Sequence, residues 1–408
     1  MKLLGFEFGR EKTGEAPAIK EADVHGFSRE WNRSGLTRTD NSSGLNAHNE
    51  RVGGPYVYFG EANRFPNYLN DLVNSSGLHS AIVDYKKNLI QGGGIEVTTA
   101  PDMTAAGLLQ VKQFTQRPNA NETLEELVEK ITLDYIVHGT VYLKVYWNSD
   151  HTKPIRIERC EPSRIRVGYN SADPEHIKSY YYCLDWDHYG QYLIKEYPAY
   201  DLASSNPVEI YRWMIPNSAM IYNTLPSYAA ATNWIQLDGE VSTYHKSNIE
   251  NSINPSITIK FYSKPANDEE KRKIVNGIKK QFSGSYNTGK AMIFFSDDKE
   301  TAPDIDPVQV SNIDKQFSVT ADSIQRNICY AHAINPSLMG LKTPGSLGNS
   351  TEIAESYGIF KETVIKPAQR DIQQIVNKFI KLNGWSAKVE LKCPEINYGT
   401  VVVKSNKH

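Results

Sequence analysis

Long hydrophobic runs and a large charge of one sign are both absent from this 408-residue sequence. No stretch reaches the roughly eighteen apolar residues that a membrane-spanning helix needs. The apolar run in the N-terminal MKLLGFEFGREK is too short for a signal peptide, so we expect a cytosolic product with no membrane partner. The formal net charge of −2 argues against a protein that grips nucleic acid tightly, because tight binding needs many phosphate contacts from lysine and arginine.

Cysteine is scarce, and no C-x-x-C pair occurs among Cys160, Cys183, Cys329 and Cys393. Isolated cysteines are typical of free thiols in a reducing compartment rather than of a disulfide framework or a zinc site.

Residue patterns that carry catalysis or bind metal are also missing. The ten histidines are scattered without H-E-x-x-H spacing, and no G-x-S-x-G segment occurs. His138 precedes a glycine that ends a helix and His332 lies near the end of another, so both are expected to pack or cap. Asp297 and Asp298 follow a strand and are interpreted as a solvated turn. The sequence therefore predicts no enzyme activity, no catalytic residue, no metal site and no cofactor.

The residues that are present predict a folded protein of two or three domains. Hydrophobic residues make up 39% of the chain, and its 24 tyrosines suit large contact surfaces, since the ring packs while the hydroxyl stays wet. Residues 1–65 are the exception, because they are rich in glycine, asparagine, serine and charge, which predicts a flexible N-terminal arm.

Residues 66–228 are predicted to form an α+β domain. A helical pattern at 78–89 stops at three consecutive glycines, and a capping box formed by Thr123 and Glu126 opens a helix that ends at Gly139. Alternating segments then predict a mostly antiparallel sheet: TVYLKVYW, PIRIERC, SRIRVGY, SYYYCLDW, QYLIKEY and VEIYRWM.

The second half of the chain is predicted to contain long helices around a small insert. A helix at 229–253 has a narrow apolar stripe, which is typical of packing against neighbours in a bundle or ring. Residues 254–312 are predicted to be a strand–helix–strand insert. Helices follow at 313–334 and 351–385, the second with Pro367 inside it as a predicted kink, and residues 386–408 hold a final strand, AKVELKC, and a tail.

GSYNTGK, residues 284–290, matches the phosphate-loop spacing G-x-x-x-x-G-K at Gly284, Gly289 and Lys290. A phosphate loop follows a strand and opens a helix, whereas here the predicted helix comes first and the predicted strand follows. Ala291 also replaces the hydroxyl residue that would contact magnesium. We therefore interpret Gly284 as a helix C-cap and the segment as a turn.

Four segments in order resemble the portal proteins of tailed bacteriophages. They are WIQLDGEVSTYHKSNIENSINPS, DEEKRKIVNGIKKQFSGSYNTGKAMIFF, VSNIDKQFSVTADSIQRNICYAHAINPSLMGL and SLGNSTEIAESYGIFKETVIKPAQRDIQQIV. The resemblance covers residues 228–385 by motif and 66–227 by architecture. It implies a virion protein that forms a ring, usually of twelve subunits, at one capsid vertex, through which double-stranded DNA passes.

The same resemblance implies a division of the chain. Residues 66–228 would be the wing, 229–253 and 313–334 the two stem helices, 254–312 the clip, 335–350 the tunnel loop, and 351–385 the long helix beneath it. A length of 408 residues leaves little room for the large helical crown that many portals carry, so we expect none.

The resemblance also implies functional residues and partners. Tunnel-loop residues expected to face DNA are Leu341, Lys342, Thr343, Ser346 and Asn349. Lys342 is the one charge in GLKTPGSLGNS and could meet the DNA backbone non-specifically, or could be a solvated lysine. Lys290 and Lys299 of the clip are expected to face the lumen or a partner. The implied partners are further copies of the chain, the major capsid protein, the large terminase subunit, a head–tail adaptor and double-stranded DNA.

Two other interpretations stay open from sequence alone. One is a nucleotide-binding enzyme that uses Gly284, Gly289 and Lys290. The other is a different structural connector protein of the head–tail region, although adaptors tend to be smaller than this chain.

Overall fold

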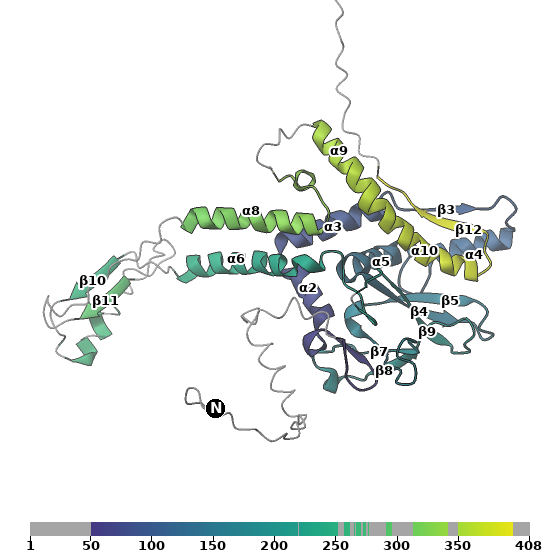
Figure 1. The fold of residues 1–408 in the computed structure, drawn as a ribbon, viewed down its shortest axis with the longest axis horizontal. Coiled ribbons are helices and arrows are strands. Elements are labelled where there is room, and N and C mark those ends of the chain that lie inside the picture. Colours follow the sequence, from purple (N-terminus) through teal and green to yellow (C-terminus); the bar gives the residue numbers. More distant parts are fainter. Residues whose placement is uncertain are drawn as a thin grey trace, which may run out of the picture. The chain divides into compact units, whose positions relative to one another are not determined.

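The computed structural model describes residues 50–218, 220–251, 257–261, 265, 267–270, 272–274, 276, 291–295, 313–341 and 350–394 (Figure 1). Within these ranges helices and strands alternate and mix, as the α+β prediction requires. Contacts between distant segments of the chain determine where the candidate functional residues lie.

A group of helices forms the first part of the core. These are α2 (Phe65–Ser75), α3 (Gly77–Gln91), α4 (Ala105–Gln116) and α5 (Leu124–His138), with strand β3 (Ile95–Thr99) between α3 and α4. The capping box is confirmed, since the Thr123 hydroxyl accepts from the Glu126 N–H and the Glu126 carboxylate accepts from the Thr123 N–H. The predicted end of α5 is also confirmed, because Gly139 adopts the left-handed conformation at φ 68°.

Two three-stranded antiparallel sheets follow α5, where one mostly antiparallel sheet was predicted. The first has the order β5–β4–β9, and the second has the order β6–β7–β8. Their strands are β4 (Thr140–Trp147), β5 (Pro154–Cys160), β6 (Ile165–Val167), β7 (Ser179–Tyr182), β8 (Lys195–Pro198) and β9 (Val208–Met214). The bounds of β4, β5 and β9 coincide with the predicted segments, and the other three strands are shorter than predicted.

Residues 50–65 depart from the predicted arm. They form the antiparallel pair β1 (Glu50–Val52) and β2 (Val57–Phe59), followed by the turn η2 (Glu61–Asn63). Both ends of this hairpin are fixed: Val57 and Phe59 are buried, and the Glu50 carboxylate accepts hydrogen bonds from the backbone N–H groups of residues 221–223 at 2.6–3.1 Å. The order depends on these long-range contacts, which the glycine-rich local sequence does not reveal.

Two long helices flank the predicted insert. Helix α6 (Thr232–Asn251) and helix α8 (Ile313–Ala331) pack against each other, and both were predicted. Between them β10 (Ile257–Phe261) pairs in parallel with β11 (Ala291–Phe295), as a strand–helix–strand unit requires. The predicted N-cap is confirmed as well, because the Asn267 side chain accepts a hydrogen bond from the Glu270 N–H at 2.8 Å.

The last long helix was predicted to kink at Pro367, and the structure shows a change of its hydrogen bonding just before that residue. Helix α9 (Ser350–Phe360) continues into a π-helical turn, η7 (Lys361–Ile365), and then into α10 (Lys366–Leu382). The Lys366 N–H bonds to the Lys361 carbonyl, five residues back. Pro367 has no N–H and its ring crowds the preceding turn, so the wider π-turn before it accommodates the proline without ending the helix.

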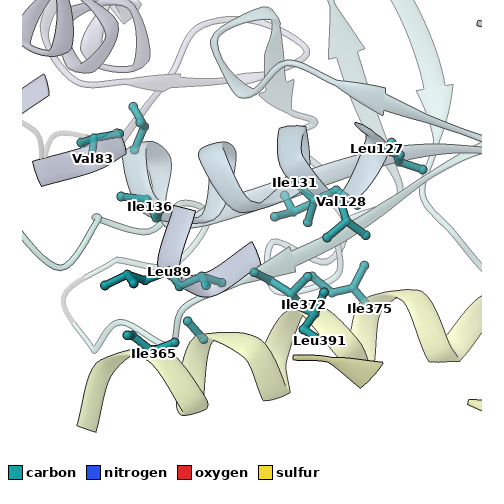
Figure 2. Close-up of a cluster of buried hydrophobic side chains, with 14 of the residues drawn as sticks. Val83, Leu89, Leu127, Val128, Ile131, Ile136, Ile365, Ile372, Ile375 and Leu391 are labelled. Carbon is teal, nitrogen blue, oxygen red and sulfur yellow. The ribbon is translucent and has the colours of Figure 1, made fainter. Parts of the chain in front are cut away.

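The main hydrophobic core joins these segments. Val128 and Ile131 of α5 lie toward Ile372 and Ile375 of α10 (Figure 2), and Leu127 of α5 belongs to the same cluster. All five side chains are fully buried. The same cluster includes residues of α2, α3, α6 and α8, so helices from both halves of the chain share one core.

Strand β12 (Ala387–Leu391), which was predicted, pairs antiparallel with β3, which was not. The turn that enters β3 is closely packed. Gly92 has φ 63°, and a Cβ atom placed on it would lie 1.7 Å from the Lys392 carbonyl oxygen. Gly92 therefore serves both as the C-cap of α3 and as the contact point for the end of β12.

We predict that Gly92→Ala lowers the free energy of unfolding by about 2 kcal/mol or more, because the methyl group adds both backbone strain and a clash with backbone. Gly93→Ala is the matched control: Gly93 has no positive φ, and its nearest neighbour would be the Lys392 side chain at 3.6 Å. Urea unfolding of both variants measures the difference. Equal stability of the two variants would contradict the packing described.

Candidate functional site

Most of the residues predicted to act directly lie outside the described part of the chain. Lys290, Lys299, Lys342, Thr343, Ser346 and Asn349 all belong to this group. The helices and turns on either side of the predicted tunnel loop are described, and they are therefore the part of the candidate site that can be built from contacts.

Leu341 is the predicted loop residue that the structure describes. It follows the 3-10 turn η6 (Pro336–Met339), which Asn335 caps by accepting a hydrogen bond from the Ser337 N–H at 3.0 Å. The Leu341 N–H bonds to the Pro336 carbonyl, and the half-buried Leu341 side chain packs against the main core. The loop therefore starts from a fixed point. Beyond the loop, Ser356 of α9 accepts a hydrogen bond from the Asn335 amide at 2.9 Å.

A buried group of three rings holds the end of α8 against α3. His79 Nδ1 lies 2.9 Å from His332 Nε2, and both side chains are at most 1% exposed. Tyr228 stacks on His332 with ring centroids 5.0 Å apart, and its hydroxyl donates to the Val137 carbonyl at 2.8 Å. We call these three residues the ring joint. His332 thus packs in the core, as expected, but its partner is a second histidine that sequence reasoning did not identify.

Burial, with a smaller contribution from nearby charge, keeps the two imidazoles of the ring joint neutral. Burial, reinforced by the Lys86 ammonium, lowers the pKa of His79 to about 4. Burial, Lys86 and His79 together lower the pKa of His332 well below its ordinary value. Between two neutral rings one nitrogen donates and the other accepts, so protonating both would place two N–H groups against each other.

Helix α10 is fixed by polar contacts as well as by its apolar face. The Gln369 amide donates to the Ile90 carbonyl at 2.8 Å, and the Asn383 amide donates to the Pro154 carbonyl at 3.2 Å. The Lys378 ammonium lies 4.5 Å and 4.7 Å from the ring centroids of Tyr200 and Tyr211. These contacts attach the helix that follows the predicted loop to α3 and to the first antiparallel sheet.

No group of three or more His, Cys, Asp or Glu residues is placed to hold a metal ion in the described ranges. GSYNTGK lies outside them, but helical residues from 268 precede it and β11 begins at Ala291, directly after it. This order is the reverse of a phosphate loop. The described helices include none that is long and apolar enough to span a membrane.

Several large apolar side chains are exposed. Four belong to the connection between β7 and β8: Leu184, Tyr189, Tyr192 and Leu193, of which Leu193 is 84% exposed. Others lie on α4, α8 and α9, including Leu109, Tyr330 and Ile359. The four side chains of the β7–β8 connection are close together in sequence, and the others come from separate helices.

Comparison with known proteins agrees with this fold. A family model described as "Phage portal protein" matches residues 110–394, which is more than half of the chain. The chain therefore belongs to the phage portal protein family. No curated protein sequence matches the chain.

Solved structures with a similar fold come from gene transfer agent particles. The chain is similar to a protein in the neck of an empty particle computed with C6 symmetry, with TM-score 0.58, 16% identity, and coverage of 88% of this chain and 91% of that one. It is also similar to a protein in the virion of the native gene transfer agent, with TM-score 0.57, 16% identity and coverage of 85% and 88%. A third similar chain is in the neck of the native particle computed with C12 symmetry, with TM-score 0.54, 16% identity and coverage of 88% and 91%.

The buried histidines predict a loss of stability in acid. The pKa of His138 is also lowered, to about 3, chiefly by burial. Because the folded pKa values of these histidines lie below 6.5, their stabilising contribution is present above pH 6.5 and is lost as pH falls toward 4. Each such histidine adds up to about 1.4 kcal/mol per pH unit to the slope of the free energy of unfolding against pH.

Urea unfolding between pH 7 and pH 4 tests this expectation. His79→Gln should make the slope shallower by roughly one proton's contribution. His176→Gln is the control, since His176 is exposed and should leave the slope unchanged. If the free energy of unfolding of His79→Gln falls with pH as steeply as that of the wild type, burial in the ring joint does not keep His79 neutral.

Proposed function

We propose that this chain is one subunit of a ring-shaped head-to-tail connector at one vertex of a viral capsid, through which double-stranded DNA is packaged and later ejected. The observation that carries the proposal is the family match over residues 110–394. The order of elements supports it. Along the sequence the small β10–β11 unit lies between two long helices that pack together, α6 and α8, and a loop and a further long helix follow.

The proposed division of the chain follows these elements. Residues 66–228 form the wing, to which the hairpin at 50–59 now adds. Residues 229–253 and 313–334 are the stem helices, 254–312 the clip, 335–350 the tunnel loop, 351–385 the interrupted long helix, and 386–408 the C-terminal strand and tail. The ring joint then lies where the second stem helix meets the wing helix α3.

Ring formation is supported by the distribution of apolar surface. Helix α6 buries Ile235 in the core and packs Trp234, Leu237 and Val241 against it, whereas most of the other α6 side chains that the structure describes are exposed or half-exposed. The exposed apolar side chains of the β7–β8 connection, α4 and α9 are suited to contact a neighbouring subunit. Similar chains come from necks computed with C6 or C12 symmetry, which favours a ring of twelve subunits.

DNA would pass through this ring without recognition of its base sequence. A net charge of −2 suits a channel in which a duplex slides, because strong pairing with phosphates would hold it in place. Leu341, Lys342, Thr343, Ser346 and Asn349 are proposed to face the duplex, with Lys342 as a non-specific phosphate contact. Lys290 and Lys299 are proposed to face the lumen or a partner at the clip.

The proposed partners are the major capsid protein, the large terminase subunit and then a head–tail adaptor. The chemistry of ATP hydrolysis would belong to the terminase, and the connector itself would be non-enzymatic. Calorimetric titration with ATP and magnesium separates this proposal from a nucleotide-binding enzyme: binding that Lys290→Ala abolishes would favour the enzyme.

Purified protein is predicted to form a closed ring in the absence of nucleotide. Native mass spectrometry should give a mass near twelve times 46.0 kDa. Negative-stain images should show a central opening wide enough for a duplex, about 20 Å or more. A compact monomer or dimer at all concentrations would overturn the channel.

Lys342 is predicted to contribute one non-specific phosphate contact per subunit that meets DNA. With assembled rings, Lys342→Ala should weaken duplex binding equally for unrelated sequences and make its salt dependence shallower by about one unit for each contact removed. Lys388→Ala is the control, because Lys388 lies exposed on β12 and is not proposed to face the channel. Identical salt dependence for both variants would indicate a solvated loop lysine.

A further inference from the structure

The two-stranded sheet β12–β3 has two outer edges, and hydrogen bonds define which backbone groups face each one. The Lys392 N–H donates to the Gly94 carbonyl, and the Ala100 N–H donates to the Ser386 carbonyl. Because this pattern alternates along an antiparallel pair, Glu96 and Thr98 direct their backbone groups toward β12. Ile95, Val97 and Thr99 therefore direct their N–H and C=O groups away from it.

The outer edge of β12 is closed by a side chain. Asn377 of α10 donates from its amide nitrogen to the Val389 carbonyl at 2.9 Å and accepts from the Val389 N–H at 2.7 Å. A side-chain amide here replaces the two hydrogen bonds that another strand would make. No further strand can pair at the centre of this edge while Asn377 is in place.

The outer edge of β3 has no such cover within the residues that the structure describes. No hydrogen bond partner is found there for the outward backbone groups of Ile95, Val97 and Thr99. The strand also lacks the devices that protect an edge, since Ile95–Thr99 contains no proline and no bulge, and its one charge, Glu96, points to solvent. Ile95 and Val97 already pack on the main core, so a strand added here would extend an ordered sheet.

The chain leaves β12 close to this open edge. The Tyr357 hydroxyl donates to the Pro394 carbonyl at 2.9 Å. A Cβ placed on Gly92 would lie 3.2 Å from Pro394 Cδ, so Pro394 sits beside the turn that enters β3. Residues 395–408 follow, and they include TVVVK, Thr400–Lys404, whose first four residues are β-branched and have strong strand preference.

The connection is long enough to reach the edge. Residues 395–399 can span up to about 17 Å, since an extended residue covers at most about 3.5 Å. Two strand spacings amount to about 10 Å. A segment that starts at the Ile95 end and runs toward Thr99 would lie parallel to β3.

We propose that Thr400–Lys404 adds to the outer edge of β3 of the same subunit as a third, parallel strand, giving the order β12–β3–tail. The same subunit is the occupant because a five-residue connection gives a far higher effective concentration than a separate chain. This contact closes the one edge of the sheet that no described side chain protects, and it does not depend on ring formation.

Hydrogen–deuterium exchange of the full chain, resolved at single amides, tests the proposal. In the wild type the Val97 and Thr99 amides should be protected. The double variant Val401→Pro/Val402→Pro removes two successive N–H groups, one of which faces β3 in either register of the tail, and it should make these amides exchange about tenfold faster or more. Asn406→Pro is the matched control beyond the segment and should leave exchange as in the wild type. The Val389 amide, held by Asn377, should stay protected in all three proteins.

Three outcomes would overturn the proposal. They are unprotected Val97 and Thr99 amides in the wild type, unchanged exchange in Val401→Pro/Val402→Pro, or protection that appears only at concentrations where rings form. The last result would assign the edge to a neighbouring subunit. Exchange measured below the assembly concentration is independent of the ring, so failure of the connector proposal and failure of the tail contact give separate results.

Discussion

The packing of α10 against α3 and α5 is the contact on which the rest of the fold depends. Its apolar face, with Ile372, Ile375 and Phe379 fully buried, joins a segment near residue 375 to helices that end before residue 140. Hydrogen bonds from Gln369 to Ile90 and from Asn377 to Val389 fix its position along its axis. Because α9 and the end of α8 connect to the same core, the segment predicted to reach DNA is bounded on both sides by rigid structure.

Polar groups inside this core give the joint between α8 and α3 its specificity. A purely apolar contact would allow small shifts of one helix on the other, whereas the His79–His332 hydrogen bond has a single geometry. Tyr228 stacks on His332 and its ring lies tilted against His79. Because Tyr228 comes from the segment just before α6, the same three side chains position both long helices. In a connector of the proposed kind, this arrangement would transmit force on the stem to the wing.

Local signals in the sequence predicted helices α3, α5, α6 and α8, the interrupted last helix and the strands of the first sheet, but not α2 or α4. The capping box at Thr123, the glycine at 139 and the alternation in β4 and β9 are local signals. Each depends only on residues a few positions apart, so each can be recognised without knowledge of the fold. Strand β3 was missed because its partner β12 lies almost 300 residues later, and α4 was missed because it buries few apolar side chains beyond Val111 and Phe114. The ring joint was missed for a related reason: His79 and His332 become neighbours only through packing. The family resemblance, not any local signal, suggested the loop residues, and these stay a proposal.

The π-turn at Lys361–Ile365 holds one residue more than an α-helix needs over the same length. In evolutionary terms it has the form of a single-residue insertion, located where Pro367 already disfavours regular hydrogen bonding. Removing one residue would restore a continuous helix but rotate α9 by about 100° relative to α10. Tyr357 and Phe360 would then leave the core that they now help to fill. The length of this segment is therefore expected to be less free to vary among relatives than the identity of its exposed residues.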